Sequence, residues 1–276
     1  MNSVQPLLST RLSVHYERKL PVLQEIALEM REGEILGLVG QSGSGKSTLA
    51  LAILGLLDMR RATPDGSIYF RGCDLLRLSE REMRAIRGRS LGLVLQSPLS
   101  SLNPALKIRT QLREAWKAHA SGSLQDCDAA VEQALISVSL PADTEFLRRY
   151  PKQLSVGQAQ RVLIAMAVMH RPALLVTDEA TSALDVITQS QILALFARLN
   201  KENSMGILYI SHDLPSIAGL CDRIAILHEG RIVECASSED IFKDPQHSYT
   251  RDLVAALPET PVRNSRAAKA TASSPG

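Results

Sequence analysis

Short runs of apolar residues recur along the chain and predict β-strands that are separated by helical segments. One of them, "EILGLVG" at residues 34–40, has the unbroken apolar character of a buried strand and ends in glycine. The predicted strands cover residues 11–14, 26–30, 34–40, 66–72, 90–96, 173–177, 207–210 and 223–233. The last of these contains Glu229 and Gly230, which predict a hairpin turn. Because strands alternate with helices, the pattern predicts an α/β fold with a mostly parallel sheet.

Helical signals fill the segments between these strands. Residues 47–57 predict one helix, and "LSEREMRAIRG" predicts another, with Ser79 and Glu82 as a capping box at its start and Gly88 at its end. From Ser97 to about Tyr150 the strand signals vanish and helical patterns dominate. We therefore expect a helical subdomain, about residues 97–160, inserted into one domain that spans residues 1–258. Residues 259–276 are rich in alanine, serine, proline and basic residues, and we expect a disordered tail there.

Composition narrows the function classes without choosing one. A chain of 276 residues, 45% of them hydrophobic, suits one large α/β domain with an insertion. The net charge of +2 lacks the strong basic excess of nucleic-acid-binding domains, so we expect no nucleic-acid partner. The four cysteines are scattered and predict free thiols rather than a zinc site or disulfides. No signal peptide and no membrane-spanning run is expected, so a membrane function would require a partner.

The stretch "GQSGSGKST", residues 40–48, fits the phosphate-loop pattern G-x-x-x-x-G-K-[ST] between a predicted strand and a predicted helix. Backbone N–H groups of such a loop bind phosphate oxygens, and the positive end of the following helix strengthens the binding. The pattern assigns Lys46 to the β- and γ-phosphates and the Ser47 hydroxyl to Mg²⁺. The predicted nucleotide-binding residues of this loop are Gly40, Gln41, Ser42, Gly43, Ser44, Gly45, Lys46, Ser47 and Thr48. The alternative is a glycine-rich turn that binds no ligand.

Two adjacent carboxylates follow a second buried strand, in "ALLVTDEA" at residues 173–180. At the same sheet edge as a phosphate loop they suit a division of labour, in which Asp178 holds the Mg²⁺ shell and Glu179 polarises the attacking water. A solvated acidic turn is the alternative.

Single polar residues end two further predicted strands. His212 follows the strand at residues 207–210 and is a candidate for a bond to the γ-phosphate, although a lone histidine is often structural. Gln96 ends the strand at residues 90–96 and is a candidate for sensing water or ligating Mg²⁺, although a polar strand end needs no ligand.

The stretch "LSVGQAQR", residues 154–161, precedes an apolar helix. Ser155 and Gln158 fit a capping box, which by itself explains both residues. A capped helix start that carries Ser155 and Gly157 is also a potential anion site. The two interpretations agree on geometry and differ only on whether a phosphate binds.

Taken in order, these motifs resemble the ATP-binding subunit of an ABC transporter, over about residues 8–257. They correspond to Walker A (40–48), the Q-loop (Gln96), the signature motif (154–158), Walker B (174–178) with the following Glu179, the D-loop (182–185) and the switch histidine (His212). The resemblance implies a P-loop NTPase core with a mostly parallel sheet, an N-terminal antiparallel β portion and an inserted helical subdomain. It implies ATP and Mg²⁺ as cofactors, and an aromatic residue that stacks on adenine. Tyr16 is the candidate for that residue, with an ordinary surface tyrosine as the alternative.

Two domains of this family close head to tail around two ATP molecules. The resemblance therefore implies that Ser155, Gly157 and Gln158 face the ATP held by the Walker A loop of another subunit. The implied partners are a second ATPase subunit (a paralogue or another copy), two transmembrane permeases docked against the helical insert and, indirectly, a solute-binding protein. The implied location is the cytoplasmic face of the inner membrane, as a peripheral subunit.

Smaller segments resemble the ATPases of oligopeptide, dipeptide and nickel importers, namely "SLNP" at residues 101–104, "ALDV" at 183–186 and "PQHSYTRDLVAALP" at 245–258. The chain departs from the usual pattern at Val156, where glycine is common, and at Ala180 and Ser248, where proline is common. We therefore expect an ATPase that powers the import of peptides, nickel or a similar small solute. The alternatives are the ATPase of an exporter and a soluble ABC ATPase outside transport.

Overall fold

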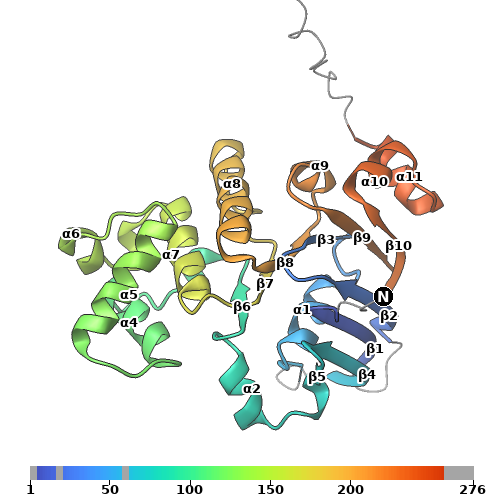
Figure 1. Cartoon of the computed structure of the whole chain (residues 1–276). Helices are drawn as coiled ribbons and strands as arrows, with labels where there is room; N and C mark the ends of the chain where they lie inside the picture. Colours follow the sequence, from blue (N-terminus) through green and yellow to red (C-terminus); the bar gives the residue numbers. More distant parts are fainter. Residues whose placement is uncertain (1–4, 17–20, 58–61, 258–276) are drawn as a thin grey trace, which may run out of the picture.

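The structure, a computed structural model, describes residues 5–16, 21–57 and 62–257 (Figure 1). Within these residues the chain forms two β-sheets and a group of helices that projects from one side. The predicted tail at residues 259–276 lies outside the described residues.

The larger sheet has the strand order β10-β9-β3-β8-β7-β6. Its strands are β3 (Ile35–Val39), β6 (Leu91–Val94), β7 (Leu174–Asp178), β8 (Gly206–Ser211), β9 (Arg223–His228) and β10 (Arg231–Ser237). All neighbours pair in parallel except β9 and β10, which form the predicted hairpin around Glu229 and Gly230. The prediction of a mostly parallel sheet is therefore confirmed.

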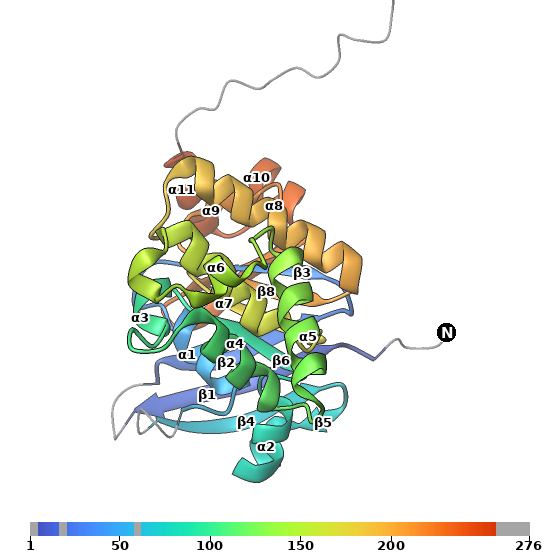
Figure 2. The same cartoon turned by 90° about the vertical axis from the view of Figure 1, so that its left-hand side faces the viewer.

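The smaller sheet is antiparallel and has the order β2-β1-β4-β5. Its strands are β1 (Leu8–Tyr16), β2 (Leu23–Met30), β4 (Ala62–Phe70) and β5 (Cys73–Asp74). They are longer than the predicted strands at residues 11–14 and 26–30, because pairing with neighbours extends each strand beyond its apolar centre. In Figure 2 this sheet lies below the larger one, and α8 (Val186–Asn203) lies on the opposite side.

Alternation along the strands of the larger sheet divides its side chains between two cores. Leu36 and Leu38 of β3 join the smaller sheet and α1 (Lys46–Ile53), whereas Ile35 and Val39 join the core under α8 and the projecting helices. Side chains that point alternately to the two faces of a strand require apolar residues at every position when both faces are covered. This explains the unbroken apolar run that the sequence shows at β3.

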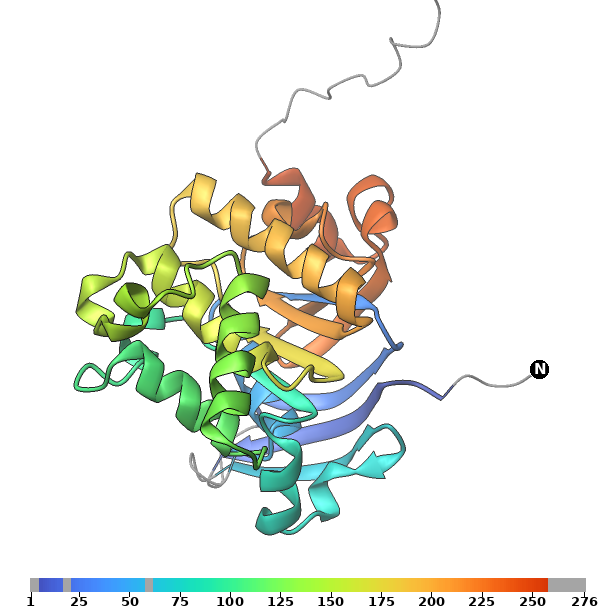
Figure 3. The same cartoon turned by 60° about the vertical axis from the view of Figure 1, so that its left-hand side comes forward.

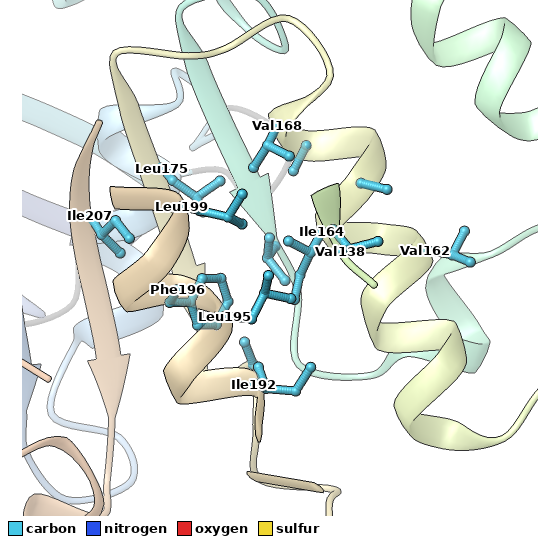
Figure 4. Packing of buried hydrophobic residues seen from close by; sticks show 14 of the residues in the cluster. Val138, Val162, Ile164, Val168, Leu175, Ile192, Leu195, Phe196, Leu199 and Ile207 are labelled. Atoms are coloured by element: carbon cyan, nitrogen blue, oxygen red, sulfur yellow. The ribbon is translucent and has the colours of Figure 1, made fainter. Parts of the chain in front are cut away.

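The projecting group contains the helices between Pro98 and Val168, in green and yellow in Figure 3. They are α3 (Pro98–Ser101), α4 (Ile108–Lys117), α5 (Leu124–Ser137), α6 (Thr144–Arg148), η3 (Pro151–Gln153) and α7 (Val156–Val168). The last of these, α7, returns the chain to the sheet. Figure 4 shows Leu195, Phe196 and Leu199 of α8 between Ile207 of β8 and Ile164 of α7.

The remaining helices are short. They are η2 (Leu75–Arg77), α2 (Glu80–Ile86), α9 (Leu214–Ile217), α10 (Ser238–Lys243) and α11 (Ser248–Ala255). The capping box of Ser79 and Glu82 begins α2 as predicted. Helix α1 ends at Ile53 rather than at residue 57, because Gly55 takes a left-handed conformation (φ +62°) that leaves the helix. Among the described helices, none combines the length and apolar character needed to cross a bilayer.

Candidate functional site

Four parallel strands end at one edge of the larger sheet, and each leads to a segment that the sequence analysis singled out. β3 leads to the loop at residues 40–45, β6 to Gln96, β7 to Asp178 and Glu179, and β8 to His212. Ligands of open α/β sheets bind at the carboxyl ends of the strands. One prediction needs correcting, since β6 ends at Val94, and Gln96 therefore lies beyond the strand instead of ending it.

The loop after β3 leaves the N-terminus of α1 without a capping side chain, as an anion-binding site requires. Gly45 is the N-cap of α1 with φ +110°, no side chain caps the helix, and no acidic residue lies in its first turn. Gly43 also has a positive φ (+82°), which glycine adopts at little cost. The first N–H groups of α1 therefore lack a side-chain acceptor from the cap residue, as a phosphate site requires.

Lys46 lies buried inside this loop. Its Nζ donates hydrogen bonds to the carbonyl oxygens of Gly40 (2.6 Å) and Gln41 (2.9 Å). Burial lowers the pKa of the Lys46 ammonium, and the negative charges of Glu179 and Asp178 oppose this shift. A cation held in a partly dry loop gains most from a nearby anion, so the residues present fit a bound phosphate group.

Glu179 is the centre of a polar cluster. Its Oε2 accepts a hydrogen bond from Nε2 of Gln96 (2.9 Å), and its Oε1 lies 3.3 Å from Nδ1 of His212. The same Gln96 amide also donates to Oγ of Ser182 (3.1 Å). Three of the predicted site residues, far apart in the sequence, are therefore brought together on one carboxylate.

The turn that carries Glu179 is held by residues that the sequence analysis did not assign to the site. Glu179 has a positive φ (+49°), and its N–H donates to the carbonyl oxygen of Ile210 on β8 (3.1 Å). The hydroxyls of Thr181 and Tyr209 are hydrogen-bonded at 2.9 Å in a buried position. Ser182 begins the D-loop motif (182–185), which the sequence analysis named without giving it a role in the site. A tyrosine within an apolar strand gives no such signal.

Ser47 and Asp178 provide the candidate ligands for Mg²⁺. Ser47 is an exposed hydroxyl in the first turn of α1, and Asp178 is the last residue of β7. Hydroxyl and carboxylate oxygens are the hard donors that Mg²⁺ prefers, and Mg²⁺ commonly completes its shell with phosphate oxygens and water. No group of three or more His, Cys, Asp or Glu side chains in the described part of the chain could hold a metal ion by itself. The donor set fits an ion that arrives with a nucleotide.

Tyr16 at the end of β1 lies beside the same loop. Its hydroxyl is 3.4 Å from Oγ1 of Thr48 in α1. A role in stacking on adenine stays a prediction.

The signature segment begins α7. Ser155 is the N-cap: its Oγ accepts from the N–H of Gln158 (3.2 Å), and the side chain of Gln158 accepts from the N–H of Ser155 (3.1 Å). The predicted capping box is therefore confirmed. Val156 is 37% exposed, and a side chain at Gly157 would press against Thr188 of α8.

The structure does not bring this segment to the phosphate loop. No hydrogen bond or ion pair between the described residues joins residues 154–158 to residues 40–48, and the two segments belong to different parts of the molecule in Figure 1. Within the described residues, the exposed Ser155 at the start of α7 is therefore not hydrogen-bonded to the chain's own phosphate loop.

Known proteins are similar to this chain in sequence and in fold. The sequence profile of a family described as "ABC transporter" matches residues 23–182. The chain is 40% identical to the dipeptide transport ATP-binding protein DppD of Haemophilus influenzae, covering 92% of this chain and 78% of DppD. It is 41% identical to the peptidoglycan transport ATP-binding protein YejF of Agrobacterium fabrum, covering 97% of this chain. The chain spans about half the length of YejF.

Solved structures of ABC proteins are similar to this chain in fold, in agreement with the relatives found by sequence. The structure of cbiO1 from Clostridium perfringens, part of the ABC transporter complex cbiONQ, aligns with a TM-score of 0.76 and 25% identity over 92% of this chain and 96% of that one. A dimeric post-hydrolysis state of the ATP-binding cassette MJ0796, bound to ADP and Pi, aligns with a TM-score of 0.72 and 28% identity over 84% of this chain and 98% of that one.

Proposed function

The chain belongs to the ABC transporter family of ATPases, and from this premise we propose that it is the ATP-hydrolysing subunit of an importer for peptides or a similar small solute. The observation that supports this proposal best is the edge of the larger sheet, where buried Lys46, the first residue of α1, donates to the loop before it and Glu179 lies with Gln96 and His212. Such an edge unites a phosphate-binding loop with a carboxylate able to accept a proton from water.

Each residue of this edge has a distinct part in the proposed reaction. The loop and the start of α1 bind the phosphates of ATP, and Lys46 moves from the loop carbonyls to the β- and γ-phosphates. Mg²⁺, held by Ser47 and Asp178, would neutralise phosphate charge. Glu179 accepts the proton of the attacking water, and Gln96 and His212 orient its two oxygens.

We propose that a second ATPase subunit completes each site. Ser155 and Gly157 lie at the start of α7, where Ser155 is exposed, and within the described residues no hydrogen bond joins this start to the chain's own loop, so their phosphate would come from another subunit. A second copy or a paralogue would serve, and the dimeric MJ0796 cassette supports the arrangement by analogy.

The permease contact is proposed at a groove between the sheet and the projecting helices. This groove, of about 330 Å³, is lined mainly by apolar side chains, including Leu54, Leu91, Leu93, Ala115, Leu163 and Met166. The groove lies between β6, the strand before Gln96, and helices α4 and α7. A permease that moves these helices relative to β6 would therefore also move Gln96, which donates to Glu179. A permease docked here, with a second permease docked on the partner ATPase subunit, would hold the chain peripherally at the cytoplasmic face of a membrane.

The names of the relatives guide the choice of solute. DppD is named for dipeptide transport, YejF for peptidoglycan transport and the 39% identical GsiA of Escherichia coli strain K12 for glutathione import. All three names denote peptide-containing solutes, which favours a peptide over nickel. A neighbouring gene set for a solute-binding protein and two permeases would support import, and co-purification of this chain with those permeases would test the partners.

The decisive experiment measures ATP binding with and without Lys46. Lys46→Ala should abolish most binding of Mg-ATP, measured by titration calorimetry, because it removes the cation from the loop. Lys201→Ala, an exposed lysine on α8, is the matched control and should bind ATP normally. Equal ATP affinity in the Lys46→Ala variant and the wild type would refute the proposed nucleotide site.

A further inference from the structure

The C-terminal helix α11 is tied to the larger sheet at its first residues. Glu234 of β10 accepts hydrogen bonds from the N–H groups of Gln246 (2.8 Å) and His247 (3.0 Å). His247 in turn caps α11, since its Nδ1 accepts from the N–H of Tyr249 (3.2 Å). The start of α11 thus has a fixed position next to the hairpin of β9 and β10, as Figure 1 shows.

Tyr249 uses this position to lie beside the phosphate loop. Its ring stacks on His228, the last residue of β9, with centroids 3.7 Å apart and an interplanar angle of 19°. The carbonyl of the preceding Leu227 touches the start of the loop so closely that a Cβ at position 40 would collide with it. The stacked pair therefore sits next to the first peptide of the loop, between Gly40 and Gln41.

The hydroxyl of Tyr249 faces that peptide. Its oxygen is buried and has no hydrogen-bond partner within the described residues. Burial raises the pKa of the Tyr249 hydroxyl, and the backbone N–H of Gln41 opposes this shift. On its other side the same peptide is held by Lys46, which donates to the carbonyl of Gly40 at 2.6 Å.

We propose that Tyr249 is a positioning residue for nucleotide binding, whose hydroxyl accepts the N–H of Gln41 when Lys46 leaves the loop carbonyls for the phosphates. This inference rests on the proposed function. Once Lys46 turns to a phosphate, the carbonyls of Gly40 and Gln41 lose their side-chain donor, and the loop needs another support to keep its shape. Tyr249 supplies it from a different element, so the position of α11 and the affinity of the loop for phosphate are linked.

The test compares Tyr249→Phe and Tyr249→Ala in the full chain. Tyr249→Phe keeps the ring on His228 and removes only the hydroxyl, so it should raise the Kd for Mg-ATP about twofold to tenfold, the range of one hydrogen bond, with an unchanged melting temperature in the absence of nucleotide. Tyr249→Ala should lower both the affinity and the melting temperature. The matched control is Tyr69→Phe, on an exposed tyrosine of β4, which should change neither.

Amide hydrogen exchange at Gln41 provides a second measurement. It reports on this one N–H group directly, so it can be interpreted even if a variant is less stable than the wild type. With a non-hydrolysable ATP analogue bound, this amide should exchange slowly in the wild type and faster in Tyr249→Phe. Wild-type affinity and wild-type exchange in Tyr249→Phe would overturn the inference, because the ring alone would then suffice. A wild-type chain that binds ATP independently of Lys46, or not at all, would instead overturn the proposed function.

Discussion

Nε2 of Gln96 lies 2.9 Å from Oε2 of Glu179 and donates a hydrogen bond to it, across 83 positions of sequence. Gln96 lies in the passage from β6 into the projecting helices, while Glu179 directly follows β7 and has a left-handed backbone conformation (φ +49°). A shift of the projecting helices relative to the sheet would therefore move Gln96, which donates a hydrogen bond to the proposed catalytic carboxylate. This contact gives the proposed permease groove a short physical route to the site of ATP hydrolysis.

Replacement of Glu179 should separate binding from hydrolysis. Glu179→Gln keeps the size of the side chain and an acceptor for Gln96, but it cannot take a proton from water. Positioned general bases contribute roughly 10²–10⁴-fold to rate, so turnover in the assembled transporter should fall by that factor while Mg-ATP still binds. Phosphate release measures the first effect and calorimetry the second. Glu202→Gln, on an exposed residue of α8, should retain wild-type turnover. Near-normal turnover of Glu179→Gln would assign the base to another residue.

Replacement of Ser155 should damage a site on the other subunit. Ser155→Arg places a bulky cation at the exposed start of α7, which should leave ATP binding to the chain's own loop intact and prevent closure on the partner's ATP. The assay is ATP occlusion in a mixed dimer in which one subunit carries the change. Ser123→Arg is the control, because Ser123 forms the same type of capping box at the exposed start of α5. If Ser155→Arg instead impaired ATP binding at the phosphate loop of the altered chain itself, residues 154–158 would serve only as a helix cap.

Alkaline pH should weaken the fold through two buried groups. Burial raises the pKa of Tyr209 from 10.0 to about 12 and that of Cys221 from 9.0 to about 12. Both stay protonated in the folded chain at a pH where the unfolded chain already loses the protons. Their contribution to the free energy of unfolding is therefore complete below pH 9.0 and is lost as the pH rises to about 12.

Thermal melting at increasing pH measures this loss. Above pH 10.0, the ordinary pKa of tyrosine, the melting temperature of the Tyr209→Phe variant should fall less steeply with pH than that of the wild type. It should start from a lower stability, by roughly 1–3 kcal/mol, because the buried hydroxyl of Thr181 loses its partner. Identical slopes in the two proteins would show that Tyr209 ionises freely in the folded state.

Truncation of Phe196 should show how far α8 stabilises the core in Figure 4. Its ring is fully buried and meets Tyr209 edge to face, with centroids 5.7 Å apart. Phe196→Ala should lower the free energy of unfolding by about 3–5 kcal/mol, measured by urea denaturation. Ile187→Ala changes a residue of the same helix that is 72% exposed, and it should stay within about 0.5 kcal/mol of the wild type. Similar losses in both variants would place the stabilising face of α8 elsewhere.

The sequence by itself determined the local features of this protein. The loop from β3 into α1, the capping boxes of Ser79 and Ser155 and the hairpin turn at Glu229 each depend on residues within a few positions of one another. Their hydrogen bonds close inside one turn, so the residue types are sufficient to predict them. The parallel sheet followed from the alternation of strands and helices. The end of α1 was missed because a glycine near a helix end can either continue the helix or leave it.

Only the tertiary structure decided which of these features meet. The contacts of Glu179 with Gln96 and His212 depend on the order β8-β7-β6 in the sheet, which places the ends of three strands side by side. The hydrogen bond of Tyr209 to Thr181 and the position of Tyr249 beside Gln41 depend on how the strands and α11 pack. Apolar periodicity states that a strand is buried, but it does not state which strand is its neighbour. Strand order is a property of the whole core, since each strand is placed by the area that it buries against all the others.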